Sequence, residues 1–175
     1  PRPPARPRAD VTGAAASNWK PIALALLAAL LASGLGALAT DLGPWYYGLQ
    51  KPAWQPPEWL FGPVWTTIFA LTALAAVIGW RRAPDRGSRR RMALLFGVNF
   101  LLNVGWSLIF FRLQRPDLAL LEVTLLWASI ATLMVILWPF ARVASLLLLP
   151  YLAWVSFAAV LNLAVVRLNA PFPGI

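Results

Sequence analysis

Neither cysteine nor histidine occurs among the 175 residues, and charged side chains make up only 12% of them. Without cysteine the chain can form no disulfide and has no thiolate nucleophile, and without histidine it has no imidazole general base. The usual ligands of zinc and of haem iron are missing for the same reason. The sequence therefore predicts no metal site, no bound cofactor and no catalytic centre of the common acid–base or nucleophilic kinds.

Apolar side chains are what the chain has in abundance. Hydrophobic residues make up 60% of the sequence, and ten residues are tryptophan against three tyrosines. An ordinary soluble domain carries roughly 25% charged residues, about twice the proportion found here. A soluble chain of this length could not hide so much apolar surface from water, so the composition predicts a membrane protein.

The charged residues mark the ends of five uncharged runs, each about 20 residues long. A helix of about 20 residues crosses a hydrocarbon core of about 30 Å, whereas strands of a membrane barrel alternate polar and apolar residues. These runs are apolar on all sides, so we predict an all-α, polytopic bundle over residues 19–169. The predicted spans are about 21–40, 59–80, 92–111, 118–141 and 143–166. A disordered basic tail (1–18) and a short C-terminal tail (170–175) flank them.

The first run could also be read as a signal peptide ending at Ala37-Leu38-Ala39. It is longer than a signal core of about 7–15 residues, and about 20 residues precede it, which favours a membrane span.

The net charge of +9 is distributed unevenly about the predicted spans. Eleven basic residues fall on the side of the N-terminus: Arg2, Arg6, Arg8, Lys20, Arg81, Arg82, Arg86, Arg89, Arg90, Arg91 and Arg142. The other side has Lys51, Arg112, Arg115 and Arg167. The positive-inside rule then places the N-terminus inside, in a membrane that the sequence does not identify. Because the basic residues lie beside the predicted spans, we expect them to contact anionic lipid and not nucleic acid.

The loop between the first two spans, PWYYGLQKPAWQPPEW at 44–59, contains five aromatic residues and four prolines. Proline fixes φ and holds the preceding residue extended, so we expect a stiff, mostly non-helical segment. Amphipathic rings collect at membrane interfaces, which is one interpretation of this composition. The other is a rigid aromatic lid over the open end of the bundle. Its residues would be Trp45, Lys51, Trp54, Pro56 and Pro57.

Three predicted spans carry residues at helical spacing. Asn99, Asn103 and Trp106 share one face of the third span, and buried asparagines need partners, so this face should point inward. The opposite face, Gly97, Leu101 and Gly105, allows close packing within the bundle or in a homodimer. In the fifth span Tyr151, Trp154, Ala158 and Asn162 share a face, and Trp65 and Phe69 stack in the second. Such rings either pack together or bind a flat apolar ligand.

Glu122 lies about one turn into the fourth predicted span. An ionisable residue inside a span is a candidate functional group. A carboxylate near a helix N-terminus is also favoured by the helix dipole, and both interpretations stay open.

Several motifs in order resemble the translocator protein family, also called the peripheral benzodiazepine receptor or tryptophan-rich sensory protein family. The matching segments are Trp45-Tyr46, Lys51-Pro52-Ala53-Trp54-Gln55-Pro56-Pro57, Pro63-Val64-Trp65-Thr66, Asn103-Val104-Gly105-Trp106-Ser107, Pro150-Tyr151-Leu152-Ala153-Trp154-Val155 and Leu161-Asn162. The resemblance implies a five-helix bundle, usually dimeric, with a pocket beneath the first loop for porphyrins and synthetic ligands. By motif position its lining would be Tyr46, Trp65, Asn103, Trp106, Trp154 and Ala158.

The resemblance leads to two functional hypotheses. The first is a protein that binds porphyrin for transport or sensing, with Lys51 pairing with a propionate. The alternative is an enzyme that degrades porphyrin in light, through Trp65 and Trp154. Family members that recognise cholesterol have a tyrosine where this chain has Leu163, and no basic residue closely follows Tyr151. The sequence therefore argues against cholesterol as a partner.

Overall fold

The computed structural model describes residues 19–172, and within this range it contains helices and no strand. Its elements are α1 (Lys20–Ala39), α2 (Pro44–Gly48), α3 (Glu58–Arg82), α4 (Arg86–Ser107), the π-helical turn η2 (Leu108–Arg112), α5 (Pro116–Leu137), α6 (Arg142–Leu147) and α7 (Leu149–Asn169). The tail predicted at 1–18 and residues 173–175 lie outside the described range.

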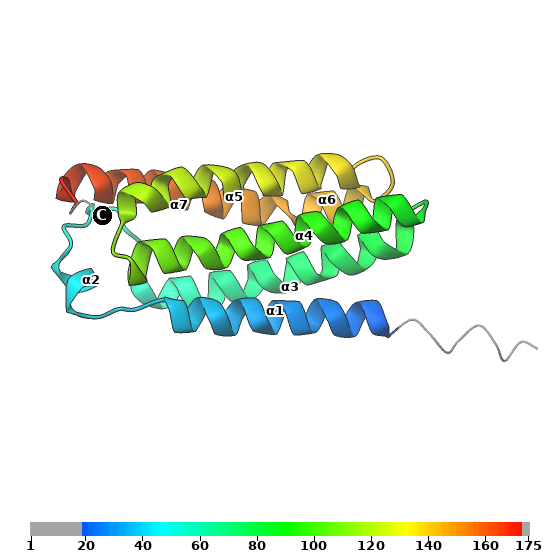
Figure 1. Cartoon of the computed structure of the whole chain (residues 1–175), viewed down its shortest axis with the longest axis horizontal. Helices are drawn as coiled ribbons and strands as arrows, with labels where there is room; N and C mark the ends of the chain where they lie inside the picture. Colours follow the sequence, from blue (N-terminus) through cyan, green and yellow to red (C-terminus); the bar gives the residue numbers. More distant parts are fainter. Residues whose placement is uncertain (1–18, 173–175) are drawn as a thin grey trace, which may run out of the picture.

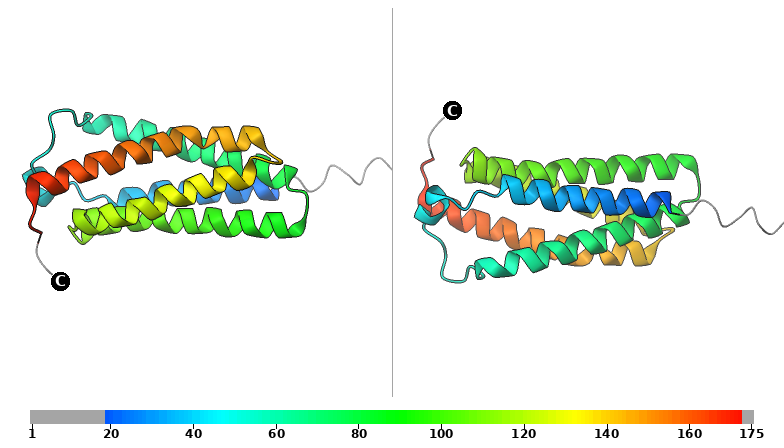
Figure 2. Two further views of the ribbon diagram at one scale, coloured as in Figure 1. Left: turned by 90° about the horizontal axis from the view of Figure 1, so that it is seen from above. Right: turned by 90° about the horizontal axis from the view of Figure 1, so that it is seen from below.

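The long helices run side by side along one axis (Figures 1 and 2). α2 lies at one end of the bundle, beside the end of α7, and the α3–α4 and α5–α6 turns lie at the other. Among the described residues four helical segments have the length and hydropathy of membrane spans: 58–82, 86–112, 116–137 and 142–169. α1 adds a shorter apolar stretch, Ile22–Gly36. The helical membrane bundle predicted from the spacing of charges is thus confirmed.

Local chemistry explains where several helices begin and end. Asp85 caps α4, because its carboxylate accepts a hydrogen bond of 2.8 Å from the Ser88 backbone N–H, which also lowers the pKa of Asp85. α5 begins at Pro116, where a missing N–H costs nothing. Pro150 cannot donate to the preceding turn, and the predicted fifth span is accordingly divided into α6 and α7.

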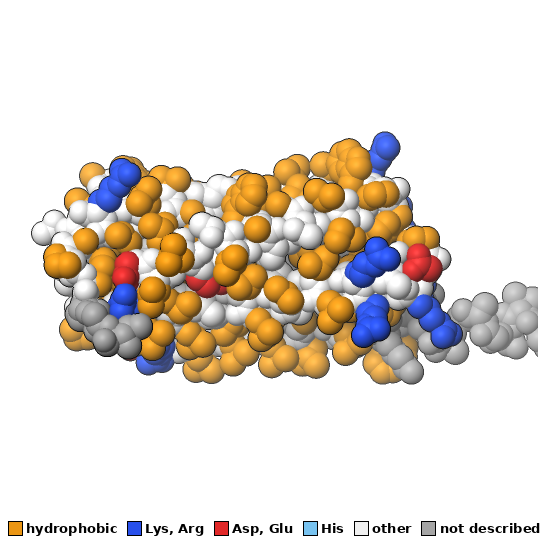
Figure 3. Space-filling view, turned by 45° about the horizontal axis from the view of Figure 1, so that its top comes forward, with side chains coloured by type: hydrophobic (Ala, Val, Ile, Leu, Met, Phe, Trp, Pro, Cys, Tyr) orange, Lys and Arg blue, Asp and Glu red, His pale blue; other side chains and the backbone are white. Residues whose placement is uncertain are grey.

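The core lies along one face of α5, whose Val123, Leu126, Ile130, Leu133 and Leu137 are all buried. This face packs against α4, α6 and α7. By contrast, large hydrophobic side chains on the outside stay exposed along the length of the bundle, and basic residues collect toward its ends (Figure 3). Such an exterior suits lipid and not water.

Candidate functional site

The loop between α1 and α3 is fastened to the bundle at two points. The amide of Asn169, at the end of α7, bonds both the N–H and the C=O of Gln50, each at 2.8 Å. Arg112 donates to the Leu38 carbonyl at 2.6 Å and to the Asp41 carboxylate at 3.2 Å. Segments far apart in the sequence therefore hold the loop over one end of the bundle.

Polar groups of the loop gather around Tyr46 of α2. The Lys51 ammonium lies 3.6 Å from the centre of the Tyr46 ring and 3.8 Å from the Glu58 carboxylate. The Gln55 amide donates to the Tyr46 hydroxyl at 3.4 Å. Burial, with a smaller contribution from Glu58, raises the pKa of Tyr46 above its ordinary value. The phenol is therefore protonated at neutral pH, and an anionic ligand would compete with Glu58 for Lys51.

Beneath this loop lies a cavity of about 60 Å³, which we call the chamber. Five aromatic rings from α2, α3, α4 and η2 form its walls: Tyr46, Phe61, Trp106, Phe110 and Phe111. The Trp106 and Phe110 rings stack at 5.1 Å, and Phe110 lies 4.8 Å from Phe111. The indole N–H of Trp106 is buried without a hydrogen-bond partner. The chamber thus offers ring faces and one unused donor.

The π-helical turn η2 places both Phe110 and Phe111 on the chamber, between Trp106 and Arg112. A π turn is rare and often lies at a functional site, because the extra residue redirects the side chains that follow. Neither phenylalanine was predicted as a site residue. The adjacent Phe-Phe pair before Arg112 was the available signal, but a regular helix would have pointed the two rings about 100° apart.

α7 contributes another wall of the chamber, where Ala158, Asn162 and Val165 line it. Asn162 is 1% exposed. With its amide oriented to satisfy both atoms, its nitrogen donates to the Pro116 carbonyl at 3.0 Å and its oxygen accepts from the Leu120 N–H at 3.1 Å. Asn162 therefore joins α7 to the start of α5, whereas the small Ala158 leaves part of the chamber open.

The structure brings together three of the six predicted ligand-binding residues. Tyr46, Trp106 and Ala158 line the chamber, and Asn103 lines a second, deeper cavity. Trp65 and Trp154 line neither cavity. Their rings lie one layer back: Trp154 is edge-on to Phe61 of the chamber at 5.6 Å, and Trp65 is edge-on to Tyr151 of the deeper cavity at 6.1 Å.

The predicted lid residues have different surroundings. Lys51 lines the chamber, and Trp45 is edge-on to Phe110 at 6.0 Å. Trp54 is exposed and reaches Phe157 of α7 at 5.8 Å. Pro56 is half-buried, and Pro57 immediately precedes the first residue of α3. The loop thus covers the chamber with a mixture of packed and exposed side chains.

The chamber is too small for a porphyrin while the loop is fastened, since drug-sized ligands need roughly 300–1,000 Å³. A ligand of that size would fit only with the loop displaced. Asn169→Ala should release Gln50 and speed exchange of its amide hydrogen about tenfold, the effect of losing about 1.4 kcal/mol of local stability. Hydrogen-exchange mass spectrometry would measure this, with the exposed Arg167→Ala as the control. Unchanged protection of the loop in Asn169→Ala would contradict the assignment of this fastening.

The face of α4 predicted for close packing points away from the described bundle. Gly97 and Leu101 are exposed, and a Cβ added at Gly97 or Gly105 would meet no atom within 4 Å. The face is therefore free for a second copy of the chain, and the homodimer stays a prediction.

Both carboxylate oxygens of Glu122 are buried without a hydrogen-bond partner. Glu122 is the seventh residue of α5, beyond the first turn, where the helix dipole has little effect. The described residues contain no group of three or more acidic side chains that could hold a metal ion. Glu122 is thus an unsatisfied carboxylate inside a span.

Known proteins are similar to this chain over most of its length. The model of the TspO/MBR family matches residues 22–168. A tryptophan-rich protein TspO of Chlorobaculum tepidum is 45% identical over 130 residues, which cover 71% of this chain and 80% of the relative. Another from Archaeoglobus fulgidus is 38% identical over 152 residues, covering 84% and 96%. The translocator protein of Homo sapiens is 34% identical over 131 residues, covering 74% and 78%.

Proposed function

Because the chain belongs to the TspO/MBR family and is an integral, multi-pass membrane protein, we propose that its chamber binds a porphyrin or another flat apolar ligand. In this proposal, binding serves either to transport the tetrapyrrole or to sense it. The loop between α1 and α3 is the lid that admits the ligand and then shields it from water.

The convergence of five aromatic rings on one space carries the proposal. Aromatic faces offer a flat π-system large contact area and favourable stacking geometry. The unpartnered Trp106 N–H supports it further, since a buried donor gains from an acceptor on a ligand. At the mouth, the Lys51 ammonium and the protonated Tyr46 hydroxyl provide donors for a propionate.

Trp106→Ala should weaken the binding of protoporphyrin IX by about tenfold, because it removes one stacking face and one donor. Titration of detergent-solubilised protein, read by quenching of the remaining tryptophans, would measure the affinity. Trp59→Ala, a change at a 72% exposed indole of the same membrane end, is the control and should have no effect. Equal affinities in both variants would contradict the proposal, and competition by cholesterol would contradict the ligand class.

A second candidate function is light-dependent breakdown of porphyrin. It is favoured by the contact of Trp154 with Phe61, which places an indole one ring away from the chamber. Illumination of the protein with protoporphyrin IX under oxygen should then give less product in Trp154→Phe, at unchanged affinity. Product formation independent of Trp154 and Trp65 would count against an enzymatic role for the indoles.

A further inference from the structure

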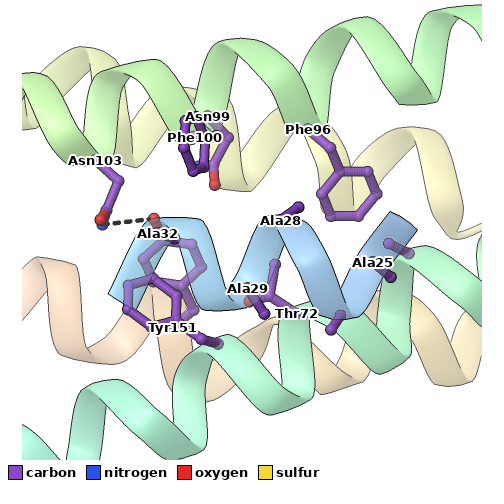
Figure 4. Close-up of a pocket in the computed structure, with 13 residues that line it drawn as sticks. Ala25, Ala28, Ala29, Ala32, Thr72, Phe96, Asn99, Phe100, Asn103 and Tyr151 are labelled. Atoms are coloured by element: carbon purple, nitrogen blue, oxygen red, sulfur yellow. Dashed lines mark hydrogen bonds between the residues drawn. The ribbon is translucent and has the colours of Figure 1, made fainter. Parts of the chain in front are cut away.

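The second, deeper cavity, which Asn103 and Tyr151 line, has a volume of about 90 Å³ and lies among α1, α3 and α4. We call it the lateral cavity. Small side chains of α1 form one wall, namely Ala25, Ala28, Ala29 and Ala32, and the rings of Phe96 and Phe100 lie across from them on α4 (Figure 4). Among the residues that the structure describes, none lines both this cavity and the chamber. The two are therefore distinct sites.

The lateral cavity opens at the outside of the bundle. Ala28 both lines it and is exposed, whereas Ala32, one turn further on, is only 5% exposed. Neighbouring outward residues of α1 are exposed leucines, such as Leu24 and Leu27, which face the acyl chains in a membrane. The entrance beside Ala28 therefore leads to lipid, and a molecule dissolved in the bilayer can enter it sideways.

Inside the cavity the polar groups are few and uncharged. Asn99 and Asn103 each donate one amide N–H, to the Ser129 and Tyr151 hydroxyls at 2.8 and 3.0 Å. The amide oxygen of Asn99 points into the space toward α1 (Figure 4). The hydroxyl of Thr72, on the α3 wall, has no hydrogen-bond partner. An acceptor and an unused hydroxyl suit a ligand that can both donate and accept, as an alcohol does.

The charge of the lining residues and the volume of the cavity narrow the class of ligand further. None of the described residues that line the cavity is charged, so they give no compensation for a buried carboxylate or phosphate. Its volume is well below the roughly 300–1,000 Å³ of sites for drug-sized molecules, and its walls are packed helices and not a loop that could be displaced, which favours a single chain. We propose that the lateral cavity binds a single-chain lipid alcohol from the bilayer. Its hydroxyl donates to Asn99 and pairs with Thr72, and its chain leaves between α1 and α4.

The test uses the full chain in phosphatidylcholine nanodiscs and a hexadecanol that carries a diazirine. After irradiation, mass spectrometry of the digested protein locates the adducts. They should concentrate on the α1 and α4 residues around the cavity, and unlabelled hexadecanol should compete where hexadecane does not. Ala28→Phe should block the entrance and reduce these adducts to background. Leu30 is 70% exposed on the same helix, so Leu30→Phe should leave the adducts unchanged.

Thr72→Val keeps the shape of the side chain and removes its hydroxyl. It therefore tests recognition of the alcohol group without changing how the helices pack. It should weaken competition by hexadecanol about fivefold, the effect of one neutral hydrogen bond, with an unchanged melting temperature. Adducts spread evenly over the lipid-exposed faces, or equal competition by hexadecane, would overturn the proposal. Displacement of the probe by protoporphyrin IX would also overturn it, because the lateral cavity would then belong to the porphyrin site.

Discussion

Ala158→Phe should weaken the binding of protoporphyrin IX by about 30-fold or more, equivalent to about 2 kcal/mol. Ala158 is half-buried on the α7 wall of the chamber, which the aromatic rings of η2 also line. A phenyl group there would occupy the space that the ligand needs, and it leaves every stacking ring in place. Tryptophan quenching in detergent measures the affinity, and the melting temperature shows whether the variant folds.

The same helix provides a matched control. Val160 is two residues further along α7 and 57% exposed, so Val160→Phe adds a comparable ring to the outside of the bundle. We expect wild-type affinity from it. A similar loss of affinity in both variants, or in neither, would mean that the ligand does not lie against Ala158.

Glu122→Leu should increase the free energy of unfolding by about 1–3 kcal/mol, the cost of a buried polar group without partners. Both Glu122 oxygens are buried and unpaired, while leucine has a similar volume and needs no hydrogen bond. Reversible unfolding in mixed detergent micelles would measure the change. A gain in stability on removal of a residue indicates that the native side chain is retained for another reason than folding.

Asp117→Asn is the control for Glu122→Leu. Asp117 lies on the same helix, but Arg115 donates to both its oxygens, at 2.8 and 2.6 Å. Neutralising it should give no gain in stability. Destabilisation by Glu122→Leu would contradict the account and would indicate that a partner satisfies this carboxylate in the membrane.

The helical bundle could be predicted because its determinants are local. Charged residues cannot enter the hydrocarbon core without cost, so the spacing between them indicates helices long enough to span it. The π turn at Leu108–Arg112 and the division of the last span at Leu148 escaped prediction. Both are departures from regular helix geometry within apolar segments, where charge spacing carries no information.

The candidate site was predictable only in part. Motif resemblance named Tyr46, Trp106 and Ala158, all of which line the chamber. It also named Trp65 and Trp154, which line neither cavity. Tyr151 lies between Trp65 and the lateral cavity, and Phe61 lies between Trp154 and the chamber, an arrangement that depends on how the helices pack. Helical spacing fixes the face on which a ring lies, but not whether another ring comes between it and the cavity.

The fastening of the loop by Asn169 could not be predicted at all. Its partner is the backbone of Gln50, 119 residues away, and a backbone partner is marked by no residue type in the sequence. Only the approach of the end of α7 to the loop makes the pair meaningful. The separation of the chamber from the lateral cavity likewise appears only once α1 lies against α3 and α4.

Crystals of the protein soaked with zinc protoporphyrin would locate the ligand most directly, through the anomalous signal of its metal. We predict a peak inside the chamber, with the macrocycle between the Trp106 ring and Ala158 and the loop displaced over it. A peak against the outer, lipid-facing surface, with the chamber still closed, would contradict binding beneath the loop.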